Sequence, residues 1–199
     1  MMRFHSMTKI AFVVAALSVG SQASAAVNLV TNGSFETGNF SGWAQFGNTG
    51  STGVTTTHSG FTPTDGSYLA YFGAVGSLGG ILQTTLATVA GHSYTISFDL
   101  SNAATGPSEY TASFGSTLLT DVVNPQPFGW TKLSFTATAT SASTALSLSF
   151  RQDPSYFMVD KVFVTAVPEP EEWAMLMMGI PLVGWQIRRK QASSAPTIA

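Results

Sequence analysis

The stretch SYTISFDL, Ser93 to Leu100, decides the fold class, because apolar and polar residues alternate along its whole length. A period of two residues is typical of a strand with one buried face. The stretch therefore predicts an antiparallel strand whose apolar side lies in the core. The apolar set is Tyr94, Ile96, Phe98 and Leu100, and the polar set is Ser93, Thr95, Ser97 and Asp99.

The same alternation recurs on the C-terminal side, over residues 133–138 and 146–150. Turn-forming Gly, Pro, Asn and Asp residues separate these stretches, and no segment between 26 and 166 has a sustained helical period. Many short strands with one buried face each require two packed sheets, so we predict an all-β sandwich. Shorter candidate strands run from Tyr68 to Phe72, Ile81 to Leu86, Tyr110 to Phe114 and Phe157 to Val164.

The composition limits the function classes. Charged residues make up 9% of the 199 residues, against about 25% in an ordinary soluble protein. Seven acidic and three basic residues fall between 26 and 166, a net charge of −4 (3 − 7), which argues against nucleic acid. The chain has no cysteine, so disulfides do not hold the fold together.

The N-terminus has the three parts of a secretory signal peptide. Arg3 and Lys9 give the first nine residues a positive charge. Residues 10–19 then form an apolar run, and the small residues Ala23 and Ala25 follow it. Ten apolar residues are about half of what a bilayer span needs. We therefore predict a signal peptide over 1–25, which signal peptidase cleaves between Ala25 and Ala26, and an exported domain over 26–166.

The C-terminal stretch VPEPEEWAMLMMGIPLVGWQIRRKQ, residues 167–191, combines three features. Pro168, Glu169 and Pro170 form an extended acidic linker, and an apolar run of 15 residues from Trp173 to Ile187 follows it. The basic residues after this run favour a cytoplasmic tail at 192–199. The pattern predicts a short transmembrane helix that inserts transiently. The basic cluster is Arg188, Arg189 and Lys190.

The order of Pro168-Glu169-Pro170, Trp173-Ala174, the apolar run and the basic cluster resembles the PEP-CTERM sorting signal in its PEPxxWA form. The resemblance implies a Gram-negative bacterium that makes an extracellular matrix, and an exosortase that acts near the PEP motif. It also implies that the protein is exported, anchored briefly in the inner membrane and then delivered to the cell surface, extracellular matrix or biofilm. A plain C-terminal anchor is the alternative.

The domain contains four segments that carry a second resemblance: NLVTNGSFETGNFSGW (28–43), AGHSYTISFDLS (90–101), Gly129-Trp130 and YFMVDKVFVTA (156–166). With these segments it resembles the galactose-binding-like jelly rolls that include carbohydrate-binding modules of the family 4/9 type. The resemblance implies a jelly-roll β-sandwich and favours core packing for Trp43 and Trp130, with sugar binding by these two rings as the alternative. Within the first of its segments, Asn32-Gly33 predicts a turn with positive φ at Gly33, and Phe35 is the expected core anchor.

The same resemblance implies a structural calcium ion held by Glu36 and Asp160 with backbone carbonyls. Lys161 stands where the family commonly has Asp or Asn, but strand alternation would put Lys161 on the face opposite Asp160. Two carboxylates with carbonyl oxygens would suffice for Ca²⁺. The alternative is a capped turn for Glu36 and an ion pair for Asp160.

Polysaccharide binding needs exposed aromatic rings, so residues near loops or strand ends are the candidates. An enzyme is disfavoured, because only His58 and His92 follow the signal peptide and no nucleophile motif is present. A structural or adhesive matrix protein without a defined ligand is the alternative to polysaccharide binding, and a glycan hydrolase is a distant third. The candidate ligand-binding residues are Tyr71, Phe72, Tyr110, Tyr156 and Phe157.

Overall fold

The computed structural model describes residues 27–168, except for the side chains of residues 82–85. The predicted signal peptide over 1–25, with its cleavage residues Ala23, Ala25 and Ala26, therefore lies outside the described residues, as does the sorting signal after Pro168. Between residues 27 and 168 there is no helix with the length and apolarity to cross a bilayer.

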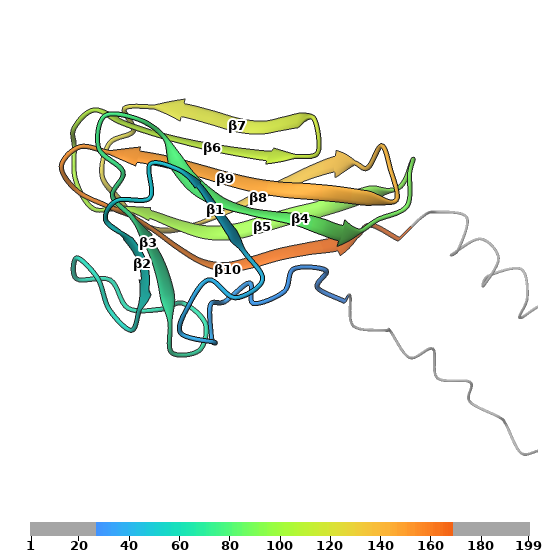
Figure 1. Cartoon of the computed structure of the whole chain (residues 1–199), viewed down its shortest axis with the longest axis horizontal. Coiled ribbons are helices and arrows are strands. Elements are labelled where there is room, and N and C mark those ends of the chain that lie inside the picture. The colour runs from blue at the N-terminus through green and yellow to red at the C-terminus, as the bar shows by residue number, and fades with distance from the viewer. Residues whose placement is uncertain (1–26, 169–199) are drawn as a thin grey trace, which may run out of the picture.

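Ten strands make up the described part of the chain (Figure 1). The alternating stretches predicted from the sequence are all strands, and three further strands near residues 44, 52 and 117 were not predicted. In chain order the strands are β1 (Ala44–Gly47), β2 (Thr52–Thr55), β3 (Leu69–Phe72), β4 (Gly79–Ala87), β5 (Ser93–Asn102), β6 (Ser108–Phe114), β7 (Thr117–Val123), β8 (Phe128–Thr138), β9 (Ser143–Gln152) and β10 (Phe157–Ala166).

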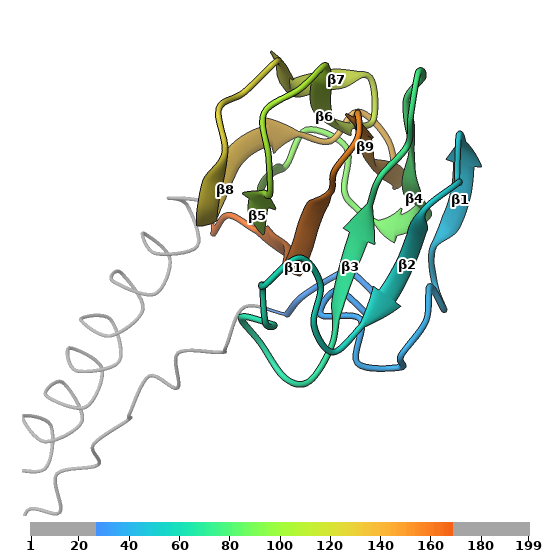
Figure 2. The ribbon, with the colours of Figure 1, turned by 90° about the vertical axis from the view of Figure 1, so that its left-hand side faces the viewer.

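The strands form two antiparallel sheets of five strands each, which face one another as two layers (Figure 2). Sheet A has the order β1-β4-β9-β6-β7, and sheet B has the order β2-β3-β10-β5-β8. The chain changes sheet at every connection except β2 to β3 and β6 to β7. The predicted all-β sandwich is therefore confirmed.

The core lies between the two sheets and is rich in aromatic rings. In β5, Tyr94, Ile96, Phe98 and Leu100 are all buried in the core, as the alternation predicts. From the two sheets, Phe72 and Phe150 stack with ring centroids 4.4 Å apart. The side chains that alternate with this apolar set point away from the core, and along β5 these are Ser93, Thr95, Ser97 and Asp99.

The segment before β1 closes one end of the core. Phe35 is fully buried, and Trp43 stacks on it with ring centroids 6.0 Å apart, so both side chains pack as predicted. The positive φ of the turn, however, belongs to Asn32 at 52° rather than to Gly33. Gly33 instead allows a close approach to β10, where a Cβ atom would collide with the carbonyl oxygen of Val162. Its own carbonyl accepts the Val162 N–H at 2.9 Å.

Candidate functional site

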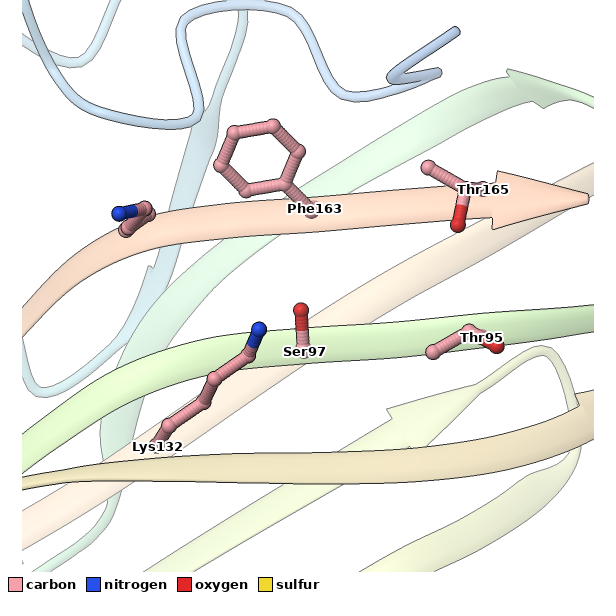
Figure 3. A pocket seen from close by; sticks show the side chains of 6 residues that line it. Thr95, Ser97, Lys132, Phe163 and Thr165 are labelled. Carbon is pink, nitrogen blue, oxygen red and sulfur yellow. The ribbon is translucent and has the colours of Figure 1, made fainter. Parts of the chain in front are cut away.

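A pocket of about 310 Å³ opens on the outer face of sheet B (Figure 3). Three neighbouring strands supply its walls, and the side chains include hydroxyl groups, two ammonium groups and one aromatic ring. Figure 3 shows Lys132 extending from β8 across to Ser97 of β5, with Phe163 of β10 on the other side. The lining residues are Thr95 and Ser97 from β5, Lys132 from β8, and Lys161, Phe163 and Thr165 from β10.

Strand register explains why most of these side chains share one face. Residues paired across an antiparallel ladder point to the same side of the sheet. Phe163 pairs with Ser97, and Thr165 pairs with Thr95, so all four point away from the core. Ser97 is nevertheless only 7% exposed, because the surrounding side chains cover it. The hydroxyl of Ser97 therefore lies at a well-shielded position in the pocket.

Lys161 reaches the pocket because β10 is irregular at this point. The pairing with β5 shifts between Asp160 and Phe163, and Lys161 has a φ of 55°. A bulge of this kind adds a residue and re-aims the side chains next to it. Asp160 and Lys161 consequently both lie on the outer face, and Val162 is the residue that turns into the core. The expectation from simple alternation, which separated Lys161 from Asp160, was wrong for this reason.

The loop between β2 and β3, residues 56–68, covers the outer face beside the pocket. Asp160 is fully buried beneath it, and its Oδ2 accepts the backbone N–H groups of Thr64 at 2.7 Å and Asp65 at 3.0 Å. The hydroxyl of Thr64 donates to Oδ2 of Asp99 at 2.7 Å. Burial raises the pKa of Asp160, although the hydrogen bonds from Asp65, Thr64 and Lys161 act in the opposite direction.

Glu36 fixes the far end of the same loop. Its carboxylate accepts the backbone N–H groups of Ser67 at 2.9 Å and Tyr68 at 3.0 Å. Gly66 lies so close to this carboxylate that a Cβ atom there would collide with it, and its φ is 65°. A glycine is therefore needed at position 66 for two separate reasons.

Neither carboxylate belongs to a group of three or more acidic or histidine side chains that could hold a metal ion within residues 27–168. Each of the four oxygens of Glu36 and Asp160 already accepts at least one hydrogen bond from a backbone N–H group. These residues fit a clamp on the loop better than a Ca²⁺ cage, in which the oxygens would face the cation. The calcium site stays a prediction.

Two of the predicted ligand-binding rings come together on the outer face of sheet B. Tyr71 stacks on His58 of the loop, with ring centroids 4.1 Å apart, and Tyr156 meets the same imidazole edge-on at 4.2 Å. Gly53 of β2 makes room for Tyr71, because a Cβ atom at residue 53 would collide with the phenol. Burial lowers the pKa of His58. All three rings are half-buried, and the assignment of Tyr71 and Tyr156 to ligand binding stays a prediction.

The other predicted rings lie in the core, which corrects their assignment as ligand contacts. Phe72, Tyr110 and Phe157 are 1%, 8% and 0% exposed, so none of them offers a platform to a sugar. Trp130 shows the opposite error, because it is not in the core. It lies on the outer face, where its indole N–H donates to the carbonyl of Thr62 at 2.9 Å and its ring meets Phe61 edge-on. Trp130 thus supports the loop.

Sequence reasoning missed the pocket. Its hydroxyl residues look like ordinary solvated strand positions, and the bulge that adds Lys161 has no signature in the sequence. The scarcity of basic residues could have pointed to the pocket, because Lys132 and Lys161 are two of the three between residues 27 and 168. Their convergence across separate strands becomes visible once the register of β8, β5 and β10 is known.

No protein-family model matches the sequence, and no curated protein matches it. Solved structures do share its fold. TmCBM61, determined in complex with β-1,4-galactotriose, has a TM-score of 0.57 at 15% identity, covering 71% of this chain and 99% of that chain. The CBM22-1 xylan-binding domain of Xyn10C from Paenibacillus barcinonensis has a TM-score of 0.52 at 17% identity, covering 74% and 99%.

A third structure with this fold belongs to a bacteriophage tailspike protein. The enzymatically active domain of tailspike protein 4 from bacteriophage CBA120 has a TM-score of 0.54 at 14% identity, covering 70% of this chain and 21% of that chain. At these identities the likeness concerns the fold. The chain therefore has a β-sandwich of the kind found in carbohydrate-binding modules, and its function has to be argued from its own residues.

Proposed function

We propose that this chain is an exported protein whose β-sandwich binds polysaccharide without cleaving it. The observation that carries the proposal is the pocket on sheet B, where the half-buried ring of Phe163 lies beside the hydroxyl groups of Ser97, Thr95 and Thr165. An aromatic ring can stack on the C–H face of a sugar, and hydroxyl groups can exchange hydrogen bonds with sugar hydroxyls. The likeness to two carbohydrate-binding modules supports the same reading.

The size and position of the pocket agree with this role. A volume of about 310 Å³ is at the lower end of the range for small-molecule sites, which suits one or two sugar units of a longer chain. The pocket lies on the outer face of sheet B, between side chains of three neighbouring strands, so a sugar chain could reach it without entering the core.

A glycan array probed with the purified 26–166 region tests the proposal. We expect reproducible binding to a polysaccharide, and loss of most of that binding in Phe163→Ala. Phe46→Ala is the matched control, because Phe46 is 36% exposed and lies on β1 of the other sheet. Equal losses in the two variants, or the absence of binding to any glycan, would contradict the proposed function.

Export and sorting are a separate part of the proposal, and they rest on the sequence. Signal peptidase would cleave after Ala25, and an exosortase would process the chain near Pro168-Glu169-Pro170 while the apolar segment holds it in the inner membrane. Mass spectrometry of the mature C-terminus, in cells with and without the exosortase, tests this. An intact Ala199 in exported protein would rule out processing at the PEP motif.

A structural or adhesive role is the second candidate. β7 is an edge strand of sheet A, and it exposes Leu118 and Val123 at 61% and 62%. Exposed apolar residues on an unpaired edge favour strand-to-strand association between molecules. Concentration-dependent assembly that Leu118→Lys abolishes, together with no glycan binding, would favour this role. Release of reducing sugar from a matrix polysaccharide would instead revive the hydrolase.

A further inference from the structure

The basic residues of the domain are concentrated at the pocket. Residues 27–168 include three Lys and Arg residues against seven Asp and Glu residues. Lys132 and Lys161 both line the pocket, although they come from different strands. The third, Arg151, lies on β9 of the other sheet and pairs with Asp153 at 2.6 Å. Two positive charges at one site of an acidic domain call for a specific explanation.

Two carboxylates adjoin these lysines along the strands, and both accept hydrogen bonds from the loop between β2 and β3. Asp99 is the register partner of Lys132 across β5 and β8, but its Oδ2 accepts the hydroxyl of Thr64. Asp160 precedes Lys161 and lies buried under the loop, where it accepts backbone N–H groups. Neither lysine makes an ion pair within 4 Å in the part of the chain that the structure describes. Both ammonium groups therefore remain available to a ligand.

We propose that the pocket binds the carboxylate of an acidic sugar unit, such as a uronic acid, within a polysaccharide. This inference rests on the proposed function and adds the substrate class. The ammonium groups of Lys132 and Lys161 pair with the carboxylate, while Phe163 packs against the sugar ring and Ser97 bonds with its hydroxyl groups. Hydrogen bonds between an ammonium and a carboxylate are stronger than those between neutral groups, which gives selectivity over uncharged sugars.

The overall charge of the domain further restricts the class of acidic polymer that the pocket could bind. A net charge of −4 over the exported domain repels a dense polyanion such as a nucleic acid, whose phosphates need many cations in a row. A pocket with two cations fits single negative charges that are spaced by one sugar unit. A uronate chain has this spacing, with one carboxylate on each ring.

Isothermal titration of the purified full chain with charged and uncharged oligosaccharides tests the inference. The probes are oligogalacturonate and oligomannuronate, and the uncharged control is fully methyl-esterified oligogalacturonate, which keeps the sugar backbone. We expect at least one acidic probe to bind roughly tenfold or more tightly than the ester, because hydrogen bonds to charged groups are lost in the ester. Binding should weaken between low and high salt, since exposed charges are screened.

Three variants assign the charge effect to the pocket. Lys132→Gln and Lys161→Gln should each weaken binding of the acidic probe about tenfold, and each should weaken binding of the methyl ester by a much smaller factor. Arg151→Gln is the matched control, because it removes one positive charge from the other sheet and should leave the affinity unchanged. The melting temperature of each variant shows that it has folded.

The outcomes separate this inference from the proposed function. Binding of acidic and neutral probes with equal affinity, lost in Phe163→Ala but not in the lysine variants, would overturn the acidic ligand and leave polysaccharide binding intact. If Arg151→Gln weakened binding as much as the lysine variants do, the charge effect would be a long-range attraction by the whole domain. That result would also overturn the acidic-ligand inference. No binding to any acidic or neutral saccharide would overturn both.

Discussion

Glu36 and Asp160 hold two neighbouring parts of one loop. The carboxylate of Asp160, in the last strand, accepts the backbone N–H groups of Thr64 and Asp65, and that of Glu36, near the start of the domain, accepts those of Ser67 and Tyr68. The loop that borders the pocket is thus tied to both ends of the sequence of the domain.

Asp160→Asn should reduce the free energy of unfolding by about 2–3 kcal/mol, because buried N–H donors would lose their acceptor. An asparagine has one oxygen, so its NH₂ group would face either the N–H of Lys161 or those of Thr64 and Asp65. Urea unfolding measures the effect. Asp121→Asn, an exposed carboxylate on β7, is the control and should change stability by less than about 0.5 kcal/mol. A similar small change in Asp160→Asn would contradict the clamp.

The loop should loosen at acid pH through His58. Burial lowers the pKa of His58 below 6.5, so the folded protein binds fewer protons than the unfolded chain between the two pKa values. The resulting stability is present above pH 6.5 and is lost as the pH falls through the folded pKa. His58→Phe keeps a ring between Tyr71 and Tyr156 but does not titrate.

Melting temperatures of the two proteins at several pH values between 7 and 5 check this prediction. The parent protein should lose stability more steeply than His58→Phe as the pH decreases. Parallel curves would mean that His58 titrates in the folded state as it does in the unfolded chain.

The calcium prediction has a direct test at Glu36. Because its oxygens already accept hydrogen bonds, we expect Ca²⁺ at roughly 5 mM, above the ~0.1–1 mM dissociation constants of extracellular sites, to move the melting temperature by no more than about 1 °C. Glu36→Gln should lower stability equally with and without Ca²⁺. A clear rise with Ca²⁺ that Glu36→Gln abolishes would establish the metal site instead.

Strand alternation made most of the fold predictable. The pattern in β5, β8 and β9 gave the strands and their buried sides, because each of these strands has one face in the core. β7 was missed because its sequence TLLTDVV does not alternate, and as an edge strand it exposes apolar side chains. β1 and β2 were missed because neither has a buried face that alternates with an exposed one: the residues of β1 are all exposed, and those of β2 are all half-buried.

The site was less predictable, for reasons that concern single residues. Tyr110 could have been placed correctly, since the alternation in SEYTASF puts it on the same side as Ala112 and Phe114. Lys161 could not, because one residue with positive φ reverses the order of faces along β10. Trp130 was expected in the core, although the alternation that buries Leu133 and Phe135 puts Trp130 on the opposite face, where its indole N–H donates to the loop.

Gly33→Ala provides a test of the contact between the first turn and β10. A Cβ atom at residue 33 would meet the carbonyl oxygen of Val162, which is backbone and cannot rotate away, and the hydrogen bond from the Val162 N–H to Gly33 would be strained. We expect a loss of about 2 kcal/mol or more in the free energy of unfolding, in the range of overpacked sites. Gly129→Ala is the matched control, because a Cβ atom there has no neighbour within 4 Å. Equal stability of the two variants in urea unfolding would show that the first turn can move away from β10 without loss.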